Sequence, residues 1–279
     1  MKLSVIIPTY NEEKYILECL RSLDKQKSVL FEVIVVDDGS SDKTLEMVSK
    51  LEPTNYDLKI LKQNHDGPAA ARNLGARHAK GKILVFVDAD MTFDNHFLSR
   101  LVKPIVLRRC KGTFSKEEYV SNWENVWARC WNINQGWEAS KRHPINYPDE
   151  QKVFRAILKS EFDRAGGFSK GGYTDDYSLY NKLGYMAQVA PGAVFFHKNP
   201  DGLKEIFYQA KWSAKREYKF GLLGIVFSLV RSSPPFSLFF GLLRAMNERE
   251  ILFAVFKLVY DFGQFIGVLE MIFLGKQYK

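Results

Sequence analysis

The stretch K-I-L-V-F-V-D-A-D, residues 82–90, joins an unbroken apolar run to two carboxylates at its end. The five consecutive apolar residues, several of them β-branched, are typical of a buried parallel strand. The run stops at Asp88 and Asp90, and like charges this close repel unless a cation neutralises them. Such oxygen ligands suit a hard ion, Mg²⁺ or Mn²⁺, that also carries phosphate. The alternative is a strand followed by a helix over residues 95–109, capped by Asp90 or Asp94.

Length, charge and cysteine content restrict the class of protein. A chain of 279 residues with 46% hydrophobic residues can bury a sizeable core, as one large domain or a domain with an appendage. The net charge of +8 is not concentrated in an arginine-rich tract, which argues against nucleic acid as a partner. Three cysteines without metal-like spacing, Cys19, Cys110 and Cys130, predict a reducing compartment and ordinary core packing. We expect no signal peptide, because the first residues enter a strand.

Apolar stretches alternate with helical patterns before residue 82. Strands are predicted at residues 3–7, 31–36 and 58–61, and helices from about residue 12, at 44–51 and at 69–79. Pro8 is expected to end the first strand, and Asn11 to cap the helix after it. This alternation predicts a doubly wound α/β sheet with right-handed crossovers.

Polar residues follow the predicted strands at the points where they end. Residues 9–12 follow the first strand, Asp37 and Asp38 the second, and Asp88 and Asp90 the fourth. Ligands of such sheets bind outside the carboxyl ends of the strands, so these loops are expected to converge on one site. Each loop taken alone is equally consistent with a turn or a helix cap. Neither a G-x-G-x-x-G after the first strand nor a G-K-[ST] loop occurs, which argues against a nicotinamide-binding or phosphate-loop protein.

Several motifs, in this order, resemble those of the family 2 glycosyltransferases. They are P-T-Y-N-E at residues 8–12, V-V-D-D-G-S-S-D at 35–42, G-P-A-A-A-R-N-L-G-A at 67–76, V-D-A-D at 87–90, A-G-G-F at 165–168 and T-D-D-Y-S-L at 174–179. The resemblance covers about residues 3–197 and is specific as a combination. It implies a GT-A fold, a doubly wound and mostly parallel nucleotide-binding sheet, over residues 1–200. It also implies inverting transfer from a sugar nucleotide, UDP- or GDP-linked.

The resemblance implies roles for the residues in the first four motifs. The loop from Pro8 to Glu12 and the Asp38 carboxylate would hold the nucleotide base, and Arg72 would help bind the nucleotide. Asp88 would lie near the ribose and the metal. The complete implied set of nucleotide-sugar-binding residues is Pro8, Tyr10, Glu12, Asp37, Asp38, Gly67, Arg72 and Asp88.

The metal and catalytic roles implied by the resemblance fall on four further residues. Asp90 would ligate Mn²⁺ or Mg²⁺ with Asp88 beside it, and His197 stands where some relatives use a metal-ligating histidine, although a histidine at a strand end is often structural. Asp176 occupies the position of the general base. Asp175 stands where glutamate is more usual, so either carboxylate is a candidate to accept the proton. In this chemistry the metal neutralises charge on the leaving diphosphate, and the base acts from the opposite face of the sugar.

Tryptophan is concentrated between the two halves of the resemblance. Trp123, Trp127 and Trp131 recur every four residues and predict one face of a helix. Core packing is the plain interpretation, and an acceptor- or membrane-facing ledge is the functional one. Trp137 and Arg142 follow the predicted helix and are the candidates for contact with the acceptor.

The composition changes near residue 200. Residues 204–219 mix basic and aromatic side chains, and the stretches 222–230, 236–243 and 251–274 are strongly apolar. No window of about 18 residues lacks a charge, so none is a clean membrane span. We predict a helical region over residues 201–279 that lies on the cytoplasmic face of the membrane. The alternative is a helical subdomain packed on the catalytic domain or on a second subunit.

Together these patterns predict a metal-dependent inverting glycosyltransferase of glycan or cell-envelope biosynthesis. Its predicted acceptor is lipid-linked, either a polyprenyl phosphate or an oligosaccharide on one. One alternative is a soluble transferase acting on a polysaccharide or a small molecule, with the tail as a homodimer interface. Another is a non-catalytic scaffold that binds nucleotide or membrane, against which the intact Asp90 and Asp176 argue.

Overall fold

The computed structural model describes residues 2–169, 176–216 and 218–274, and the chain divides into two compact units. The first unit combines Met1–Tyr119 with Asn146–His197, and the second combines Val120–Ile145 with Lys198–Lys279. The division expected at residue 200 did not anticipate that Val120–Ile145 groups with the C-terminal helices. The reason is packing between residues far apart in sequence, described below.

An eight-stranded sheet forms the centre of the first unit, in the order β3-β2-β1-β4-β9-β6-β10-β8. The strands β1 to β4 run parallel, whereas β9 runs antiparallel to both β4 and β6. The sheet is therefore mostly parallel, as predicted. Its strands are β1 (Leu3–Thr9), β2 (Phe31–Asp37), β3 (Asp57–Lys62), β4 (Ile83–Phe86), β6 (Gly112–Phe114), β8 (Glu150–Gln151), β9 (Ala156–Leu158) and β10 (Ala187–Val189).

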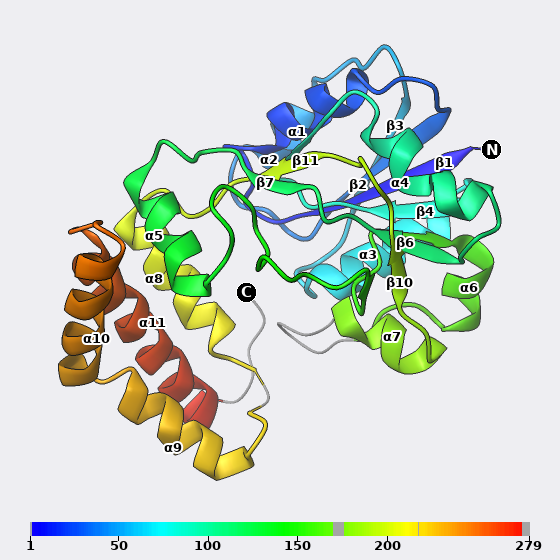
Figure 1. The fold of residues 1–279 in the computed structure, drawn as a ribbon. Helices are drawn as coiled ribbons and strands as arrows, with labels where there is room; N and C mark the ends of the chain where they lie inside the picture. Colours follow the sequence, from blue (N-terminus) through cyan, green and yellow to red (C-terminus); the bar gives the residue numbers. More distant parts are fainter. Residues whose placement is uncertain (1, 170–175, 217, 275–279) are drawn as a thin grey trace. The chain divides into compact units, whose positions relative to one another are not determined.

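Helices cover both faces of this sheet (Figure 1). Because alternate residues of a strand point to opposite faces, Val5 and Ile7 of β1 pack with α1, α2 and α4 on one face. Ile6 packs with α3, α6 and α7 on the other face. The helices are α1 (Ile16–Asp24), α2 (Thr44–Ser49), α3 (Pro68–His78), α4 (Phe97–Val106), α6 (Lys159–Arg164) and α7 (Ser178–Leu183).

A second, three-stranded sheet has the order β5-β11-β7. Its strands are β5 (Met91–Phe93), β7 (Glu118–Val120) and β11 (Phe195–His197). Because β11 runs antiparallel to β5, His197 pairs with Met91. This pairing places His197 beside the residue that follows Asp90, although the two are far apart in sequence.

The prediction that Pro8 ends the first strand is wrong. β1 continues to Thr9, and Pro8 pairs in register with Val36 of β2. On the other side β4 ends opposite Ile6, so Pro8 has a strand neighbour on one side alone. A sheet tolerates a proline at such a position, because a missing N–H there need not break a ladder.

The predicted helix caps are also wrong. α1 begins at Ile16, and the Asn11 side chain instead accepts a hydrogen bond from the Ser41 backbone N–H at 2.8 Å. Asn11 has a φ of 57°, in the left-handed region that asparagine tolerates. α4 begins at Phe97 without a side-chain cap, so neither carboxylate proposed for that role fulfils it.

The second unit is helical. Its core joins Cys130 to Ile206, Phe253 and Phe256. In α11, Gly267 permits a close approach to α8, because a Cβ there would lie 2.2 Å from a backbone oxygen. Its helices are α5 (Val126–Gln135), α8 (Leu203–Ser213), α9 (Gly221–Arg231), α10 (Pro234–Asn247) and α11 (Phe253–Leu274).

The tryptophan stripe contributes to this core. Trp127 and Trp131 pack against it, and the Trp131 ring meets Tyr260 edge-on at 5.6 Å. The core-packing interpretation is therefore confirmed for both. Trp123 lies before the helix, whose N-cap is Asn125, so the predicted helix began too early.

Among the described helices, none taken singly has the length and apolar composition to cross a membrane. α9 and α10 meet those two criteria together, with a bend of 65° between them.

Candidate active site

One guanidinium joins two of the predicted carboxylates at the carboxyl end of the sheet. Arg72 lies on α3 and is 6% exposed. Its Nη1 donates to Asp176 Oδ1 at 2.7 Å, and its Nη2 donates to Asp88 Oδ1 at 3.0 Å. Asp88 comes shortly after β4 and Asp176 shortly before α7. The fold therefore brings the strand-end carboxylate and the candidate base to the same arginine.

Arg155 is a site residue that the sequence reasoning missed. It precedes β9, and its Nη1 donates to Asp88 Oδ2 at 3.2 Å. Its backbone bonds to both neighbouring strands, since its carbonyl accepts from Phe86 and its N–H donates to Thr113. A lone arginine in the otherwise apolar run V-F-R-A-I-L was the available signal, because a buried cation needs a partner.

The two arginines keep Asp88 ionised. Burial by itself would raise the pKa of the Asp88 carboxyl, but Arg155, Arg72 and His197 together hold it well below its usual range. Burial also opposes the charge on Arg155, and Asp88 outweighs this, so the pKa of Arg155 is raised. Because each oxygen of Asp88 accepts from an arginine, this carboxylate fits the predicted nucleotide-side role better than direct metal ligation.

His197 lies between two carboxylates. Its Nε2 is 3.0 Å from Asp90 Oδ2, and its Nδ1 is 2.9 Å from Glu118 Oε1. A carboxylate that accepts from Nδ1–H leaves the Nε2 lone pair for a metal, an arrangement common around ligating histidines. Nothing in the local sequence singled out Glu118, because its approach to His197 depends on a non-local strand arrangement.

The residues present fit a divalent metal at Asp90 and His197. A carboxylate oxygen and an imidazole nitrogen 3.0 Å apart can both reach one ion at about 2.0–2.2 Å. This mixed donor set suits Mn²⁺ better than Mg²⁺, which favours oxygen ligands. No group of three or more His, Cys, Asp or Glu side chains is arranged to hold a metal within the described part of the chain. The remaining coordination positions would therefore fall to phosphate oxygens and water.

Asp38 organises the loop before α3. Its Oδ1 accepts from the Asp66 N–H and its Oδ2 from the Gly67 N–H, both at 2.9 Å. Gly67 has a φ of 90°, which a residue with a side chain adopts at a cost. Both carboxylate oxygens of Asp38 are therefore used within the protein.

Asp37, at the end of β2, differs from its neighbour. Its Oδ1 is buried and has no hydrogen-bond partner among the residues that the structure places. A buried carboxylate oxygen without a donor is costly, so the N–H of a bound ligand is a natural partner. The geometry thus favours Asp37, expected to be a neighbour of the base site, over Asp38 for a direct contact.

An aromatic pair lies next to these carboxylates. The Tyr10 ring stacks on the His65 ring with centroids 4.2 Å apart, and His65 Nδ1 lies 3.0 Å from Asp38 Oδ2. Sequence reasoning included Tyr10 and missed His65. The Glu12 backbone N–H donates to Thr44 Oγ1 at 2.7 Å and ties the first loop to α2.

The remaining predicted residues lie elsewhere or outside the description. Trp137 and Arg142 belong to the second unit, where the Arg142 guanidinium lies 5.5 Å from the centre of the Trp137 ring. Asp175 lies outside the described residues, so the choice between it and Asp176 stays a prediction.

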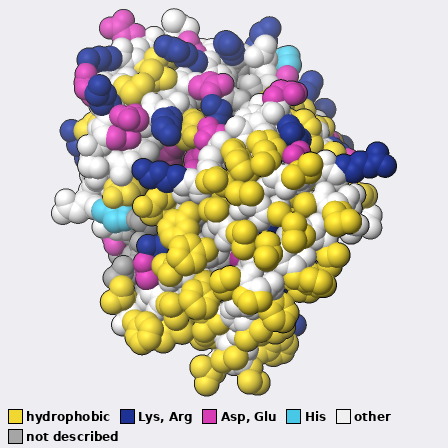
Figure 2. All heavy atoms as spheres, turned by 90° about the vertical axis from the view of Figure 1, so that its left-hand side faces the viewer, with side chains coloured by type: hydrophobic (Ala, Val, Ile, Leu, Met, Phe, Trp, Pro, Cys, Tyr) yellow, Lys and Arg dark blue, Asp and Glu magenta, His cyan; other side chains and the backbone are white. Residues whose placement is uncertain are grey.

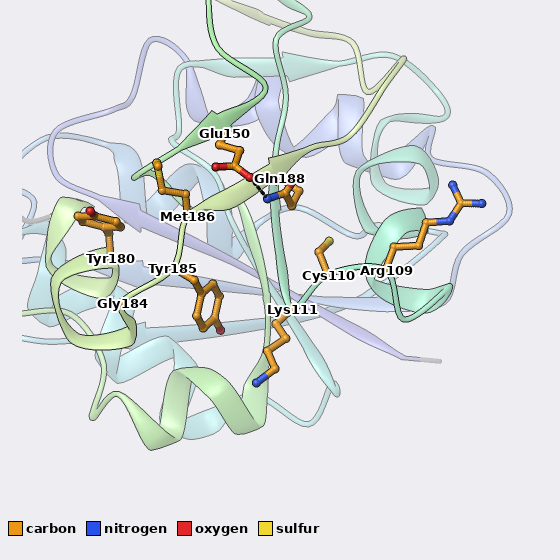
Figure 3. A pocket seen from close by; sticks show the side chains of 9 residues that line it. All are labelled: Arg109, Cys110, Lys111, Glu150, Tyr180, Gly184, Tyr185, Met186 and Gln188. Carbon is orange, nitrogen blue, oxygen red and sulfur yellow. Dashed lines mark hydrogen bonds between the residues drawn. The ribbon is translucent and has the colours of Figure 1, made fainter.

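A pocket of about 430 Å³ lies beside the outermost strand of the large sheet, β8, where it pairs with β10 (Figure 3). Arg109, Lys111 and Tyr185 line it, and Glu150 accepts from Gln188 across the two strands at 2.7 Å. None of the carboxylates described above contributes to it. It is therefore distinct from the candidate active site.

A doubly wound, mostly parallel sheet with arginine-paired carboxylates and an Asp–His pair at the carboxyl ends of its strands is typical of an α/β protein of the GT-A type. The chain belongs to glycosyl transferase family 2, because the model of that family, "Glycosyl transferase family 2", matches residues 4–170.

Two curated relatives match a segment of the chain. Over 93 residues it is 48% identical to the poly(ribitol-phosphate) beta-N-acetylglucosaminyltransferase TarS of Staphylococcus aureus, covering 32% of this chain and 16% of TarS. Over 105 residues it is 34% identical to glycosyltransferase GlyA of Streptococcus pneumoniae, covering 38% of this chain and 15% of GlyA. The matched segments are thus a small part of both relatives.

Two solved structures share the fold. TarS 1–349 of S. aureus in complex with UDP-GlcNAc matches with a TM-score of 0.58 and 22% identity, covering 100% of this chain and 93% of that one. The mannosyltransferase PcManGT of Pyrobaculum calidifontis, in complex with GDP-Man and Mn²⁺, matches with a TM-score of 0.61 and 20% identity, covering 97% and 87%. These likenesses confirm the predicted GT-A fold.

Proposed function

We propose that this protein transfers a sugar from a UDP- or GDP-linked donor to an acceptor oxygen, with inversion and with Mn²⁺ or Mg²⁺ as cofactor. The observation that carries the proposal is Arg72, which pairs with both Asp88 and Asp176. A base candidate and a nucleotide-side carboxylate are thereby held together. Membership of family 2 supports the reaction class. The nucleotide sugars bound by TarS and PcManGT support the donor class.

The donor would lie across the carboxyl edge of the sheet. Asp37 Oδ1 is the acceptor for a base N–H, and both uracil and guanine carry one on the ring. The guanidiniums of Arg72 and Arg155, next to Asp88, supply positive charge that favours a bound diphosphate. Asp88 and Asp176 balance the two guanidiniums before the donor binds, so the site is not left cationic without its ligand.

Asp90 and His197 would hold the metal, with Glu118 fixing the orientation of the imidazole. When bound, the ion neutralises negative charge that builds on the leaving diphosphate. Asp176 would accept the proton of the attacking hydroxyl, and Arg72 orients its carboxylate. If the acceptor is a phosphate, already ionised, Asp176 would orient it rather than deprotonate it.

The proposed acceptor is lipid-linked, and the protein is proposed to lie on the cytoplasmic face of the membrane. The support is apolar surface on the helical unit. Leu222, Leu223 and Phe239 are 75%, 77% and 60% exposed. Figure 2, which views the molecule from the side where α10 lies in Figure 1, shows hydrophobic side chains covering much of this face. Soluble monomers rarely expose apolar patches larger than a few hundred Å².

A second acceptor class has its own support. The name of TarS describes transfer to poly(ribitol-phosphate), a polymer. On this alternative the acceptor is a soluble polymer and the apolar face is a homodimer interface. The two alternatives differ in one measurement, because flotation with vesicles distinguishes a membrane surface from a subunit interface.

The donor proposal is tested by screening UDP- and GDP-sugars for thermal stabilisation of the full chain, with and without Mn²⁺. A specific donor at about 100 times its dissociation constant stabilises by about 2.7 kcal/mol. We expect Mn²⁺ to increase the shift and Asp37→Ala, which removes the acceptor oxygen, to reduce it. No shift with any nucleotide sugar, in a protein that unfolds cooperatively, would overturn the proposal.

A further inference from the structure

A pocket of about 770 Å³ opens within the helical unit, lined by residues of α9, α10 and α11 and by Asn134 of α5. Its volume lies within the usual range for sites that take small organic ligands. Most of its lining is aromatic or aliphatic. The apolar residues are Phe227, Val230, Phe236, Phe240, Leu243 and Phe253.

Three cations line the same pocket: Arg231, Arg244 and Lys257. Lys257 Nζ lies 2.5 Å from Asp261 Oδ1, and the Ser237 hydroxyl donates to Asp261 Oδ2 at 2.7 Å, so the charge of Lys257 is balanced inside the protein. Burial lowers the pKa of Lys257, Asp261 opposes this, and Arg231 and Arg244 lower it further. Both guanidiniums are therefore close enough to Lys257 to repel it.

The two arginines are poorly balanced by comparison. Arg244 Nε lies 3.7 Å from Glu248 Oε1, and both side chains are exposed enough for such a pair to contribute little. The Arg231 guanidinium makes no ion pair within the residues that the structure describes. The lining thus carries Arg231, Arg244 and Lys257 against Glu248 and Asp261, an excess of one positive charge.

We propose that this pocket binds a lipid carrying a phosphate monoester. Its phosphate would lie between Arg231 and Arg244, and its hydrocarbon chain along the aromatic wall. A phosphate monoester carries about −1.5 to −2 charges at neutral pH, and two guanidiniums that can each bind two oxygens match it better than they match a single carboxylate. The biological role of the site rests on the proposed membrane association of the protein, whereas its binding is measurable without any transfer.

The first probe is dodecyl phosphate, a single-chain phosphate monoester, titrated below its micelle concentration into the full chain by calorimetry. We expect saturable one-to-one binding. Inorganic phosphate lacks the chain and dodecyl maltoside lacks the charge, so both should bind at least tenfold more weakly. Equal binding of dodecyl maltoside would overturn the proposal in favour of an apolar surface. Equal binding of inorganic phosphate would overturn it in favour of a simple anion site.

Two double variants test whether Arg231 and Arg244 bind the phosphate group. Arg231→Gln with Arg244→Gln should weaken dodecyl phosphate by about tenfold or more, the effect of losing charged hydrogen bonds. The control is Lys204→Gln with Arg249→Gln, which makes the same charge change at exposed positions outside the pocket. It should change binding by less than twofold. Equal losses in the two double variants would reduce the site to general electrostatics and overturn the proposal.

Two further measurements identify the lipid and separate this proposal from the transfer reaction. Farnesyl phosphate and dioctanoyl phosphatidic acid are tested as competitors. Displacement by the first indicates an isoprenoid lipid, displacement by the second a bilayer lipid, and displacement by neither contradicts the proposal. Asp176→Asn should bind dodecyl phosphate as the unaltered protein does. The binding result therefore holds even if the proposed transfer fails.

Discussion

The carboxylate site of the first unit and the apolar face of the second unit differ in whether their side chains have partners within the protein. At the site, Asp88 pairs with Arg72 and Arg155, and Asp176 shares Arg72, so these four charges balance within the protein. On α9 and α10, side chains such as Leu223 and Phe239 are largely exposed. Ion pairs of this kind hold the side chains of the site in one fixed arrangement. An exposed apolar surface contributes little to folding, and it supports the proposed contact with a membrane or a second subunit.

The largest effect is expected at the base candidate. Asp176→Asn removes the proton acceptor but keeps the shape and one oxygen for Arg72. Transfer should fall by about 10²–10⁴, the usual contribution of a positioned acid–base group, with donor affinity nearly unchanged. Steady-state kinetics and donor titration measure both quantities. If Asp175→Asn is the more damaging change, the assignment of the base is off by one residue.

The next effect concerns stability. Arg155→Met leaves the Asp88 carboxylate with Arg72 alone. Removing one partner of a buried ion pair costs about 3–5 kcal/mol, and we expect the lower end because Asp88 is 31% exposed and keeps Arg72. Urea unfolding at pH 7 measures the loss. An unchanged free energy of unfolding would show that Arg155 does not stabilise this carboxylate.

The ion pair between Asp88 and Arg155 also predicts that the free energy of unfolding depends on pH. The pKa of Asp88 is lower in the folded protein than in the unfolded chain, so its contribution is fully present above the unfolded value of about 3.9. That contribution is lost as the pH falls below this value towards the folded pKa. Arg155→Met should therefore lose less stability than the unaltered protein over the same acid range.

The third effect is on metal binding. Asp90→Ala removes one of the two donor atoms of the proposed metal site and should abolish metal-dependent turnover while leaving the fold intact. Glu118→Gln keeps the site but weakens the orientation of His197, and should reduce Mn²⁺ affinity by about 10–100-fold. Titration with Mn²⁺ followed by electron paramagnetic resonance measures affinity directly. Wild-type turnover and affinity in Asp90→Ala would refute the assignment.

The sequence predicted the features that depend on residues close together in the chain, and it missed those that depend on residues far apart in the chain. The strands and α3 followed from local apolar periodicity, and Asp88 from its position after an apolar strand. Arg72 and Asp176 were identified through the family resemblance, and the fold brings them to Asp88. Arg155 and Glu118 were missed, since each reaches the site through strand arrangements between distant segments. The apolar run around Arg155 indicated that the arginine needs a partner, but not that the partner is Asp88. The grouping of Val120–Ile145 with the C-terminal helices was missed for the same reason.

That grouping also restricts how the apolar face can be tested. Deleting the helices after residue 200 would uncover Cys130 and Trp131, which pack on the residues of α8 and α11. A truncated chain would then fail for reasons unrelated to a membrane. Point substitutions in the full chain avoid this.

The smallest effect on stability is expected on the apolar face itself. Leu222→Ser with Leu223→Ser changes two side chains that are 75% and 77% exposed, so the free energy of unfolding should change by about 0.5 kcal/mol or less. Phe256→Ala, at a fully buried position of the same unit, should cost about 3–5 kcal/mol.

The same pair of serine substitutions should weaken retention on vesicles strongly. Salt screens the attraction of the exposed Arg216 and Lys219 to anionic lipids, but it does not screen the insertion of leucine side chains. Flotation with anionic vesicles at low and high salt should therefore show a salt-resistant fraction that the double variant loses. If the unaltered protein instead stays in the soluble fraction at low salt and runs as a dimer that the double variant dissociates, the exposed leucines serve a subunit interface. The polymer-acceptor alternative would then replace the membrane proposal.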